Sequence, residues 1–375
     1  MQFRDLKAQY LHLKDEIDAS IAEVINNTNF ISGKQVNELE EQLARYVGVK
    51  HCITCGNGTD ALTLMMMAWG IKEGDAVFVP DFTFFSSGEV VSFAGATPVF
   101  YDVCKDTFNA DVHSLEQAVI AIRSEGKLNP KAVIAVDLFG QPADYEQLQR
   151  IAEKYGLLLL EDGAQGFGGM IGSRRACSFG DAAVTSFFPA KPLGCYGDGG
   201  AVFINDDETA DYLRSVRIHG KGSFKYDNIR IGMNSRLDTL QAAILLPKFR
   251  AFREYELDAV NKVAEQYNER LDKIVTVPKI LNDFYSSWAQ YTIQVESKEV
   301  RETLQKELKE RDIPTMVYYP KPMHAQKAFA GIKQYVECPV TERLCDTVLA
   351  LPMHPYMSKE QVAFVAENIR RALDK

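Results

Sequence analysis

The sequence predicts an α/β protein made of a large N-terminal domain and a smaller C-terminal α+β domain. Up to about residue 205, short apolar runs typical of buried strands alternate with longer segments of helical periodicity. A long amphipathic segment after Pro247 leads into shorter elements of both kinds. A chain of 375 residues, of which 46% are hydrophobic, can bury one large core and a smaller one. We therefore expect two domains, residues 1–247 and 248–375.

The individual elements follow from two patterns. Helices are expected where apolar residues recur every three or four positions, as Leu13, Ile17, Ile21 and Ile25 do. In chain order they cover residues 7–26, 36–47, 61–67, a segment beginning at 81, 145–155, 209–217, 239–246, 248–271, 300–311 and 359–373. Strands are expected where short apolar runs end at turn residues. They cover residues 51–55, 76–80, 95–102, 132–137, 157–162, 181–188, 200–204, 288–295 and 315–318.

Composition and charge argue against several classes of partner. The formal net charge is −9 and there is no long basic run, which disfavours a nucleic-acid or anionic-membrane surface. The first seven residues are amphipathic and charged, unlike a signal peptide, and no apolar run is long enough to span a bilayer. The seven cysteines are scattered and odd in number, so we expect free thiols in a cytoplasmic protein without a metal site.

The turn that follows strand 51–55 is a candidate anion site. Gly58 and Thr59 lie in it, directly before a helix. Glycine lets the backbone approach an anion closely, and the first N–H groups of a helix favour negative charge. The spacing fits neither a Walker loop nor a GxGxxG fingerprint, so an ordinary helix N-cap is the alternative.

Two other strand ends carry candidate ligand groups. Three phenylalanines, among them Phe84, follow strand 76–80, where they either join the core or stack on a flat heteroaromatic ring. The apolar run 157–160 ends in Glu161 and Asp162, at the position where open α/β sheets place ligand groups. Alternation turns these two acids to opposite faces, so one can be buried with a partner. A solvated strand end accounts for Glu161.

Lys191 lies between Pro189 and Pro192 on a tight loop that joins two predicted core strands. The prolines restrict the loop and remove backbone donors. A surface lysine has no need of such a frame, although a plain hairpin remains the alternative. A lysine that forms a Schiff base with a bound aldehyde needs its nitrogen held in place and partly unprotonated.

These features occur in the order that pyridoxal phosphate requires. The cofactor needs a phosphate cradle, a stacking face, a carboxylate that keeps the pyridine nitrogen protonated, and a lysine for the imine. The chain also resembles the DegT/StrS family of sugar-nucleotide aminotransferases, of fold type I, along nearly its whole length. The matching stretches are residues 57–62, 80–84, 161–165, 186–200, 234–238 and 319–324. The resemblance implies a mixed, mostly parallel seven-stranded sheet between helices.

The resemblance also implies roles for the cofactor-binding residues. Lys191 forms the imine and shuttles the proton, Asp162 pairs with the pyridine nitrogen, Phe84 stacks on the ring, and Gln165 lies near its phenolic oxygen. The residues implied to hold the phosphate are Gly58, Thr59 and Ser186. Gly163 stands where relatives usually have alanine. Members with histidine in place of the lysine catalyse dehydration, and Lys191 disfavours that branch.

Further residues are implied to come from the subunit interface and the substrate side. Asn234 reaches the phosphate of the neighbouring subunit, which implies a homodimer with shared active sites. Arg236 follows it and is a candidate for an anionic substrate group, with an intersubunit salt bridge as the alternative. The residues implied to line the nucleotide-sugar side and its rim are Tyr318, Tyr319, His324, Phe30 and Ile31.

The implied reaction is a ping-pong transamination that takes the amino group from L-glutamate, releases 2-oxoglutarate, and aminates a nucleotide-linked keto sugar. The run 187–200 most resembles the subgroup that aminates C3 of UDP-2-acetamido-2-deoxy-3-oxo-glucuronate in bacterial surface-polysaccharide synthesis. The alternatives are dTDP- or UDP-linked 3-keto or 4-keto 6-deoxyhexoses and, remotely, a cofactor-binding regulatory protein. The sequence does not decide whether the polar loop 219–231 closes on substrate.

Overall fold

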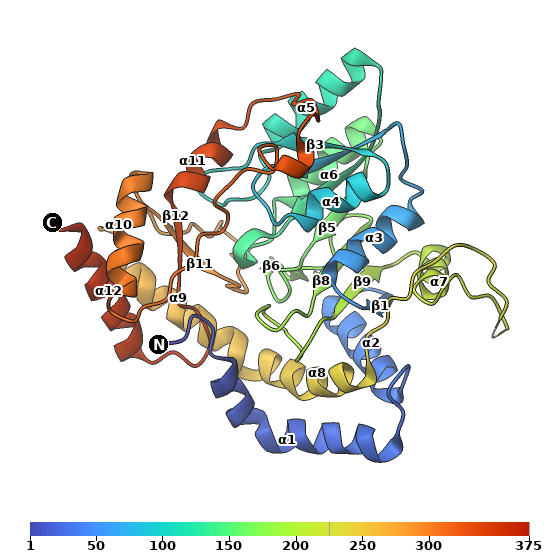
Figure 1. Ribbon diagram of the computed structural model, residues 1–375, viewed down its shortest axis with the longest axis horizontal. Coiled ribbons are helices and arrows are strands. Elements are labelled where there is room, and N and C mark those ends of the chain that lie inside the picture. The colour runs from blue at the N-terminus through green and yellow to red at the C-terminus, as the bar shows by residue number, and fades with distance from the viewer. Residues whose placement is uncertain (225, 375) are drawn as a thin grey trace.

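The computed structural model describes residues 1–224 and 226–374, and its centre is a seven-stranded sheet (Figure 1). In spatial order the strands are β1 (His51–Cys55), β9 (Gly200–Ile204), β8 (Ala182–Ser186), β5 (Leu158–Asp162), β4 (Asn129–Val136), β2 (Asp75–Pro80) and β3 (Thr97–Tyr101). The pairs from β8 to β3 are all parallel, and β9 is antiparallel to both of its neighbours. The mostly parallel seven-stranded sheet implied by the resemblance is therefore confirmed.

Helices cover both faces of this sheet because its strands are apolar on both sides. One face packs against α3 (Gly58–Ala68), α4 (Ser86–Phe93) and α7 (Asp207–Val216). The other packs against α2 (Lys34–Val47), α5 (Val112–Glu125), α6 (Tyr145–Tyr155) and α8 (Thr239–Ala251). Outside them, α1 (Leu6–Asn27) packs along α8. Helix α5 was not predicted, although Leu115, Ala118 and Ile122 have helical spacing.

The C-terminal elements form a small α+β layer. The strands β11 (Tyr291–Gln294) and β12 (Val348–Leu351) pair antiparallel beside α10 (Lys298–Lys309) and α12 (Lys359–Leu373). The predicted strand 315–318 is wrong, because only Met316 pairs there, in one bridge to Ala350. Its neighbour β12 was missed, since this four-residue apolar run follows α11 (Pro339–Thr347) with no turn residue between them.

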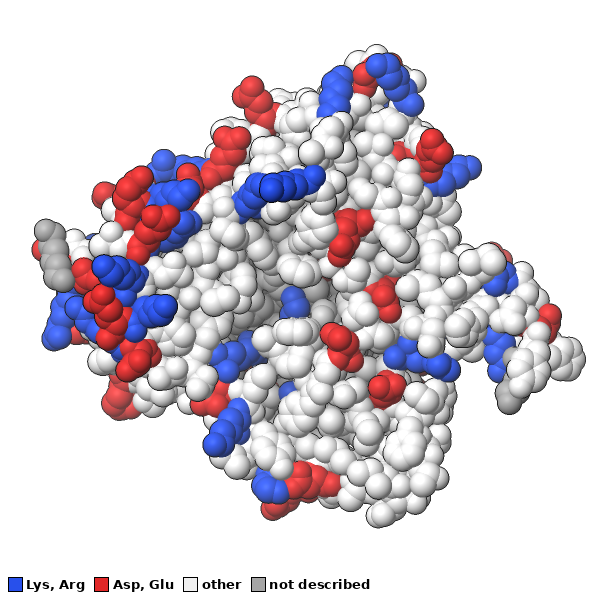
Figure 2. Space-filling view, in the orientation of Figure 1, with Lys and Arg blue, Asp and Glu red and all other residues white. Residues whose placement is uncertain are grey.

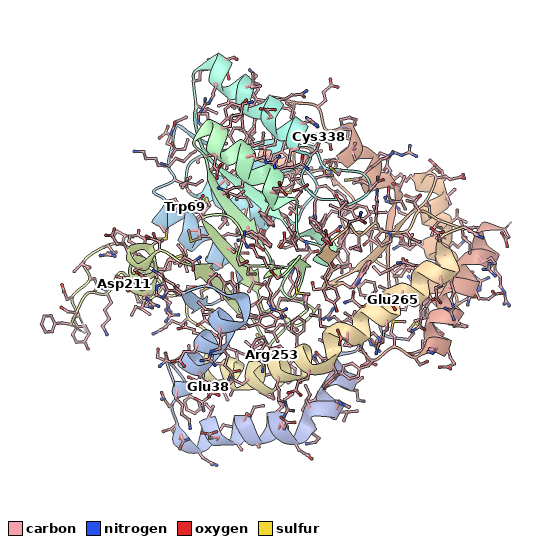
Figure 3. The ribbon with its side chains drawn as sticks, turned by 180° about the vertical axis from the view of Figure 1, so that it is seen from behind. Glu38, Trp69, Asp211, Arg253, Glu265 and Cys338 are labelled. Atoms are coloured by element: carbon pink, nitrogen blue, oxygen red, sulfur yellow. The ribbon has the colours of Figure 1, made fainter. Side chains whose placement is uncertain are left out.

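Two predicted helix boundaries are also wrong. Helix α8 continues through Pro247, and a π-helical turn (Phe252–Glu256) joins it to α9 (Leu257–Leu271). In Figure 3, Arg253 marks this junction and Glu265 lies further along the same helical line. A proline inside a helix costs about 3 kcal/mol, and burial of Pro247 against neighbouring elements offsets this. The division after residue 247 stays a prediction, because the helix passes through it.

The remaining features are three short strands and the segment after β2. The strands β6 (Met170–Ile171), β7 (Arg174–Arg175) and β10 (Phe284–Tyr285) form a small sheet of their own. The helix predicted to begin at residue 81 begins at Ser86 instead. Asp81 does not cap it, because its carboxylate is occupied by the backbone N–H and ring of His324.

Candidate active site

Several of the predicted site residues lie where the parallel strands end. The last residues of β5 and β8 are Asp162 and Ser186, and Ser186 lies opposite Gly200, as Cys55 does on β1. Figure 2 shows a hollow near the middle of the face, between the large sheet and the C-terminal elements, with positively charged side chains inside it. The loops that follow these strand ends therefore face one opening.

The anion-site candidate is a compact cradle at the N-terminus of α3. Asn57 caps the helix, with its Oδ1 accepting from the Asp60 N–H at 2.8 Å. A Cβ on Gly58 would lie 2.8 Å from the Cβ of Ser186, so these segments touch only because residue 58 has no side chain. The hydroxyls of Thr59 and Ser86 lie 2.7 Å apart. Hydroxyls and helix N–H groups thus converge as a phosphate requires.

Asp162 is buried at the end of β5. Its Oδ2 accepts from the Ser87 hydroxyl at 2.9 Å and its Oδ1 from the Ala164 N–H at 3.2 Å. Burial raises the pKa of Asp162, while these two donors and the positive charge of Lys191 oppose the rise. A protonated ring nitrogen beside this carboxylate would favour its charged form, so Asp162 fits a pyridine nitrogen.

Lys191 lies on the loop between β8 and β9. Its N–H donates to the Phe188 carbonyl at 2.8 Å, and a Cβ on Gly194 would lie 2.5 Å from the Pro189 carbonyl oxygen, which shows how tight the loop is. Burial lowers the pKa of Lys191; the Asp162 carboxylate opposes this and the Arg4 guanidinium adds to it. A lowered pKa increases the fraction of unprotonated amine, which imine formation needs.

Phe84, Gln165 and Tyr319 come together beside this pair. The Gln165 amide donates to the Tyr319 hydroxyl at 3.1 Å and accepts from the Phe139 N–H at 2.8 Å. The rings of Phe84 and Tyr319 have centroids 6.3 Å apart, and 54% of Phe84 is exposed, so a flat ring can reach it. Tyr318 lies next along the wall.

His324 is held by Asp81, the residue that follows β2. Its Nδ1 lies 2.6 Å from Asp81 Oδ2, and its N–H donates to Asp81 Oδ1 at 2.8 Å. Since Asp81 is fully buried, this pair fixes the loop that carries Tyr318 and Tyr319.

Four predicted residues form a separate group. They are Asn234, Arg236, Phe30 and Ile31. The Asn234 amide oxygen accepts a hydrogen bond from Arg236 at 2.7 Å. Ile31 forms a β-bridge with Asp238, and the Phe30 carbonyl accepts from the Thr239 N–H. Within residues 1–224 and 226–374, no hydrogen bond or ion pair joins these four to Lys191 or Asp162. Arg236 lines an open cavity of about 900 Å³ under the loop 219–231.

The structure contradicts the expectation that Glu161 lies at a strand end exposed to solvent. Its carboxylate is fully buried and accepts from the N–H groups of Cys177 and Phe179. Asp137, also fully buried, lies within hydrogen-bond range of Glu161, so one of the two must hold a proton. Strand alternation showed that the acids face opposite ways, but the partner comes from another strand and has no local signal.

Sequence reasoning also missed Ser86 and Ser87, which α4 brings to the site, and Asp137, which follows β4 and pairs with Glu161. The two serines stand in the predicted segment 81–87 and could have been found there as hydroxyls beside the phenylalanines. In the described part of the chain, no three His, Cys, Asp or Glu side chains form a group able to hold a metal ion. None of its helices could cross a membrane.

A buried carboxylate at a strand end, a framed lysine of lowered pKa and a helix N-terminal cradle on a mostly parallel sheet define a pyridoxal-phosphate-dependent aminotransferase of fold type I. Residues 12–370 match the model of the DegT/DnrJ/EryC1/StrS aminotransferase family. The chain belongs to that family.

Named relatives align with nearly the whole chain. The UDP-2-acetamido-2-deoxy-3-oxo-D-glucuronate aminotransferase of Pseudomonas aeruginosa is 44% identical over 97% of this chain and 98% of its own. A pleiotropic regulatory protein of Geobacillus stearothermophilus is 41% identical over 97% and 96%. The UDP-N-acetyl-3-dehydro-alpha-D-glucosamine 3-aminotransferase of Acidithiobacillus ferrooxidans is 40% identical over 98% and 97%.

Solved structures of related proteins have the same fold. An aminotransferase of this family from Brucella abortus is 47% identical and superposes with a TM-score of 0.97 over 100% of both chains. A Bacillus subtilis relative with the cofactor PMP bound is 27% identical, with a TM-score of 0.86 over 96% of this chain and 82% of that one.

Proposed function

We propose that this enzyme transfers the amino group of L-glutamate to C3 of UDP-2-acetamido-2-deoxy-3-oxo-glucuronate, in the cytoplasm, for bacterial surface-polysaccharide synthesis. The observation that carries the proposal is the 44% identity, over 97% of this chain, to an aminotransferase named for that substrate. The loop 187–200, which holds Lys191, also resembles that subgroup.

When bound, pyridoxal phosphate would supply the aldehyde that accepts the amino group and the ring that withdraws electrons from the reacting carbon. Asp162 would keep the ring nitrogen protonated, and Phe84 and Gln165 would orient the ring. The phosphate would be bound by Gly58, Thr59, Ser86 and Ser186. Lys191 Nζ removes the proton from the α-carbon of glutamate. In the second half-reaction it returns a proton to C3 of the sugar.

The shared-site homodimer belongs to this proposal. In Figure 1 the loop between α7 and α8 projects from the body of the molecule. Phe224, Ile229 and Ile231 on it are 74%, 55% and 87% exposed. Exposed apolar side chains on a projecting loop favour burial against another protein surface. Docked on a second subunit, the loop would bring Asn234 and Arg236, which follow it, toward the partner's phosphate and substrate.

The substrate side is assigned in the same way. Tyr318, Tyr319 and His324 line the nucleotide-sugar side, with Phe30 and Ile31 at the rim. Two other substrate classes compete with the uronate. One is the UDP-linked 3-keto sugar with a neutral C6, favoured by the 40% identical relative named for it. The other is a dTDP- or UDP-linked keto 6-deoxyhexose.

A regulatory role is the remaining alternative, favoured by the 41% identical relative named as a pleiotropic regulatory protein. The net charge of −9 disfavours direct DNA binding.

The test follows the absorbance of the lysine-bound cofactor in the purified, loaded protein. Glutamate should bleach the band, and the UDP 3-oxo-uronate should restore it while 6-deoxy 4-keto sugars do not. If only the 6-deoxy sugars restore the absorbance band, they are the amino acceptors and the uronate is not. A protein that takes up pyridoxal phosphate but never responds to glutamate would not be a glutamate-dependent aminotransferase.

A further inference from the structure

The N-terminal segment passes directly beside the loop of Lys191. Arg4 Nη2 donates to the Lys191 carbonyl oxygen at 2.9 Å. Both neighbours of Arg4 are fixed: the Phe3 carbonyl accepts from the Met353 N–H at 3.0 Å, and Asp5 caps α1. The Phe3 ring also meets Tyr318 edge-on, with centroids 6.3 Å apart. The backbone therefore holds Arg4 between the lysine loop and the predicted substrate wall.

Among the described residues, the positive charge of Arg4 has no direct partner. In the part of the chain that the structure describes, no carboxylate lies within 4.0 Å of its guanidinium. Burial lowers the pKa of Arg4 to about 10, and Glu256 opposes this only through space. The Glu256 carboxylate is occupied by Gln9, at 2.8 and 3.1 Å, and by the Tyr356 hydroxyl at 2.6 Å.

A second buried cation adds to this imbalance. Lys248 is 1% exposed, and its Nζ has no hydrogen-bond acceptor among the described residues. Burial lowers the pKa of Lys248 to about 8; the Glu256 carboxylate opposes this, and repulsion from Arg4 adds to it. Arg4 and Lys248 thus place two positive charges near the Lys191 loop against the single carboxylate of Glu256, and this excess favours an anion there.

A guanidinium has five N–H donors in a planar fork that matches a carboxylate. Arg4 uses one of these donors within the protein. We propose that Arg4 is a substrate-binding residue of this aminotransferase, and that its free donors bind a carboxylate of the substrate held at Lys191. This inference rests on the proposed function, because it requires a substrate that reacts beside Lys191.

Both proposed substrates carry such a group. The α-carboxylate of glutamate is bonded to the reacting carbon, and the uronate carboxylate belongs to the same sugar ring as C3. In a ping-pong reaction the two occupy the site in turn, so one guanidinium can serve either. A purely structural Arg4 would only anchor the Lys191 carbonyl, and its loss would not discriminate between ligands.

The first experiment measures equilibrium binding by calorimetry, which is independent of turnover. The loaded enzyme and its Arg4→Met variant are titrated with UDP-N-acetylglucosaminuronate and with UDP-N-acetylglucosamine, which differ only at C6. If Arg4 binds the uronate, the variant should lose about 10-fold to 100-fold in affinity for the uronate, as for a charge-assisted hydrogen-bonded pair. Its affinity for the neutral sugar should stay within about twofold.

The second experiment measures the glutamate concentration that half-converts the lysine-bound cofactor. If Arg4 binds glutamate, Arg4→Met should raise it about tenfold or more, and Arg4→Lys should recover part of the loss. Arg371→Met, which removes an exposed charge on α12, is the matched control and should change neither measurement. Thermal unfolding of each variant separates loss of binding from loss of folding.

A change in either arm supports the proposal and identifies which carboxylate is bound. The proposal is overturned if Arg4→Met folds, weakens the uronate no more than the neutral UDP sugar, and leaves the glutamate concentration for half-conversion unchanged. It is also overturned if only Arg236→Met removes the preference for the uronate. A wild-type enzyme that responds to glutamate but binds neither UDP sugar contradicts the proposed acceptor, and the glutamate arm still decides the role of Arg4.

Discussion

At the scale of single residues, the site depends on groups whose charge is set by burial. Asp162 is held at a strand end by Ser87 and Ala164, and Lys191 is held by the tight loop that follows β8. The two act on each other through space, since each favours the charged form of the other. Chemistry at Lys191 therefore depends on neighbours that are distant in sequence.

We expect Lys191→Ala to fold normally and to lose transamination. Removing a group that moves a proton directly should lower the rate by at least about 10²-fold. The measurement is single-turnover conversion of the loaded cofactor by glutamate, with thermal unfolding as the control for folding. Near-normal conversion in a folded variant would remove Lys191 from the reaction.

The buried pair of Asp137 and Glu161 predicts a pH dependence of stability. Burial raises the pKa of Asp137 to about 7, and hydrogen bonds with Glu161, Ala143 and Tyr145 oppose the rise. Between its usual pKa of about 4 and this value, the folded state binds the proton that the unfolded state has lost. The free energy of unfolding therefore falls as the pH rises through that interval.

We expect Asp137→Asn to remove part of this fall, because the amide donates to Glu161 without needing a proton. The difference in melting temperature between Asp137→Asn and wild type should shift in favour of the variant as the pH is raised from 5 to 8. Asp137→Ala, which also loses the bonds from Ala143 and Tyr145, should be less stable at both values. A pH-independent difference between Asp137→Asn and wild type would show that the pair holds no shared proton.

At the scale of elements, function depends on how strand ends meet helix starts. The junction of β1 and α3 lies against the end of β8, and Gly58 is the point of contact with Ser186. The loop between α10 and α11 returns to the same edge, where Asp81 and His324 lock it in place. Each contact joins segments that no local pattern connects.

We expect Gly58→Ala to weaken cofactor binding. The new Cβ would lie 2.8 Å from the Ser186 Cβ, so the cradle must open and the phosphate contacts lengthen. The affinity for pyridoxal phosphate, titrated by absorbance, should fall about tenfold, in line with the loss of a charge-assisted hydrogen bond. Thermal unfolding without cofactor is the control. Unchanged affinity would place the phosphate elsewhere.

At the scale of the whole molecule, the central question is how two chains combine. The proposed dimer puts Asn234 of one subunit at the phosphate of the other. Mixed and refolded Lys191→Ala and Asn234→Ala subunits would then form heterodimers with one intact and one doubly altered site.

We expect each variant to be nearly inactive alone and the equal mixture to recover about a quarter of wild-type activity, because half of the dimers in a symmetric assembly are mixed. The measurement is steady-state transamination after refolding. A mixture no more active than the sum of its parts would mean that each site is built from one chain.

The sequence predicted most of the large domain because its signals are local. The bounds of β1, β9, α6 and α12 match their predicted residues, since apolar periodicity and turn residues mark both ends. The helix through Pro247 and the strand β12 were mispredicted, because packing across the molecule outweighs a proline and a weak local pattern.

For the site, local sequence indicated Lys191, Asp162 and the glycine turn, because a framed lysine, an acid after an apolar run and glycines before a helix are features of consecutive residues. The tertiary structure alone decided which side chains stand around them. Ser87, the proton-sharing Asp137 and the guanidinium of Arg4 reach the site from other elements. The physical reason is that burial and hydrogen bonding depend on distance in space, which only the folded chain defines.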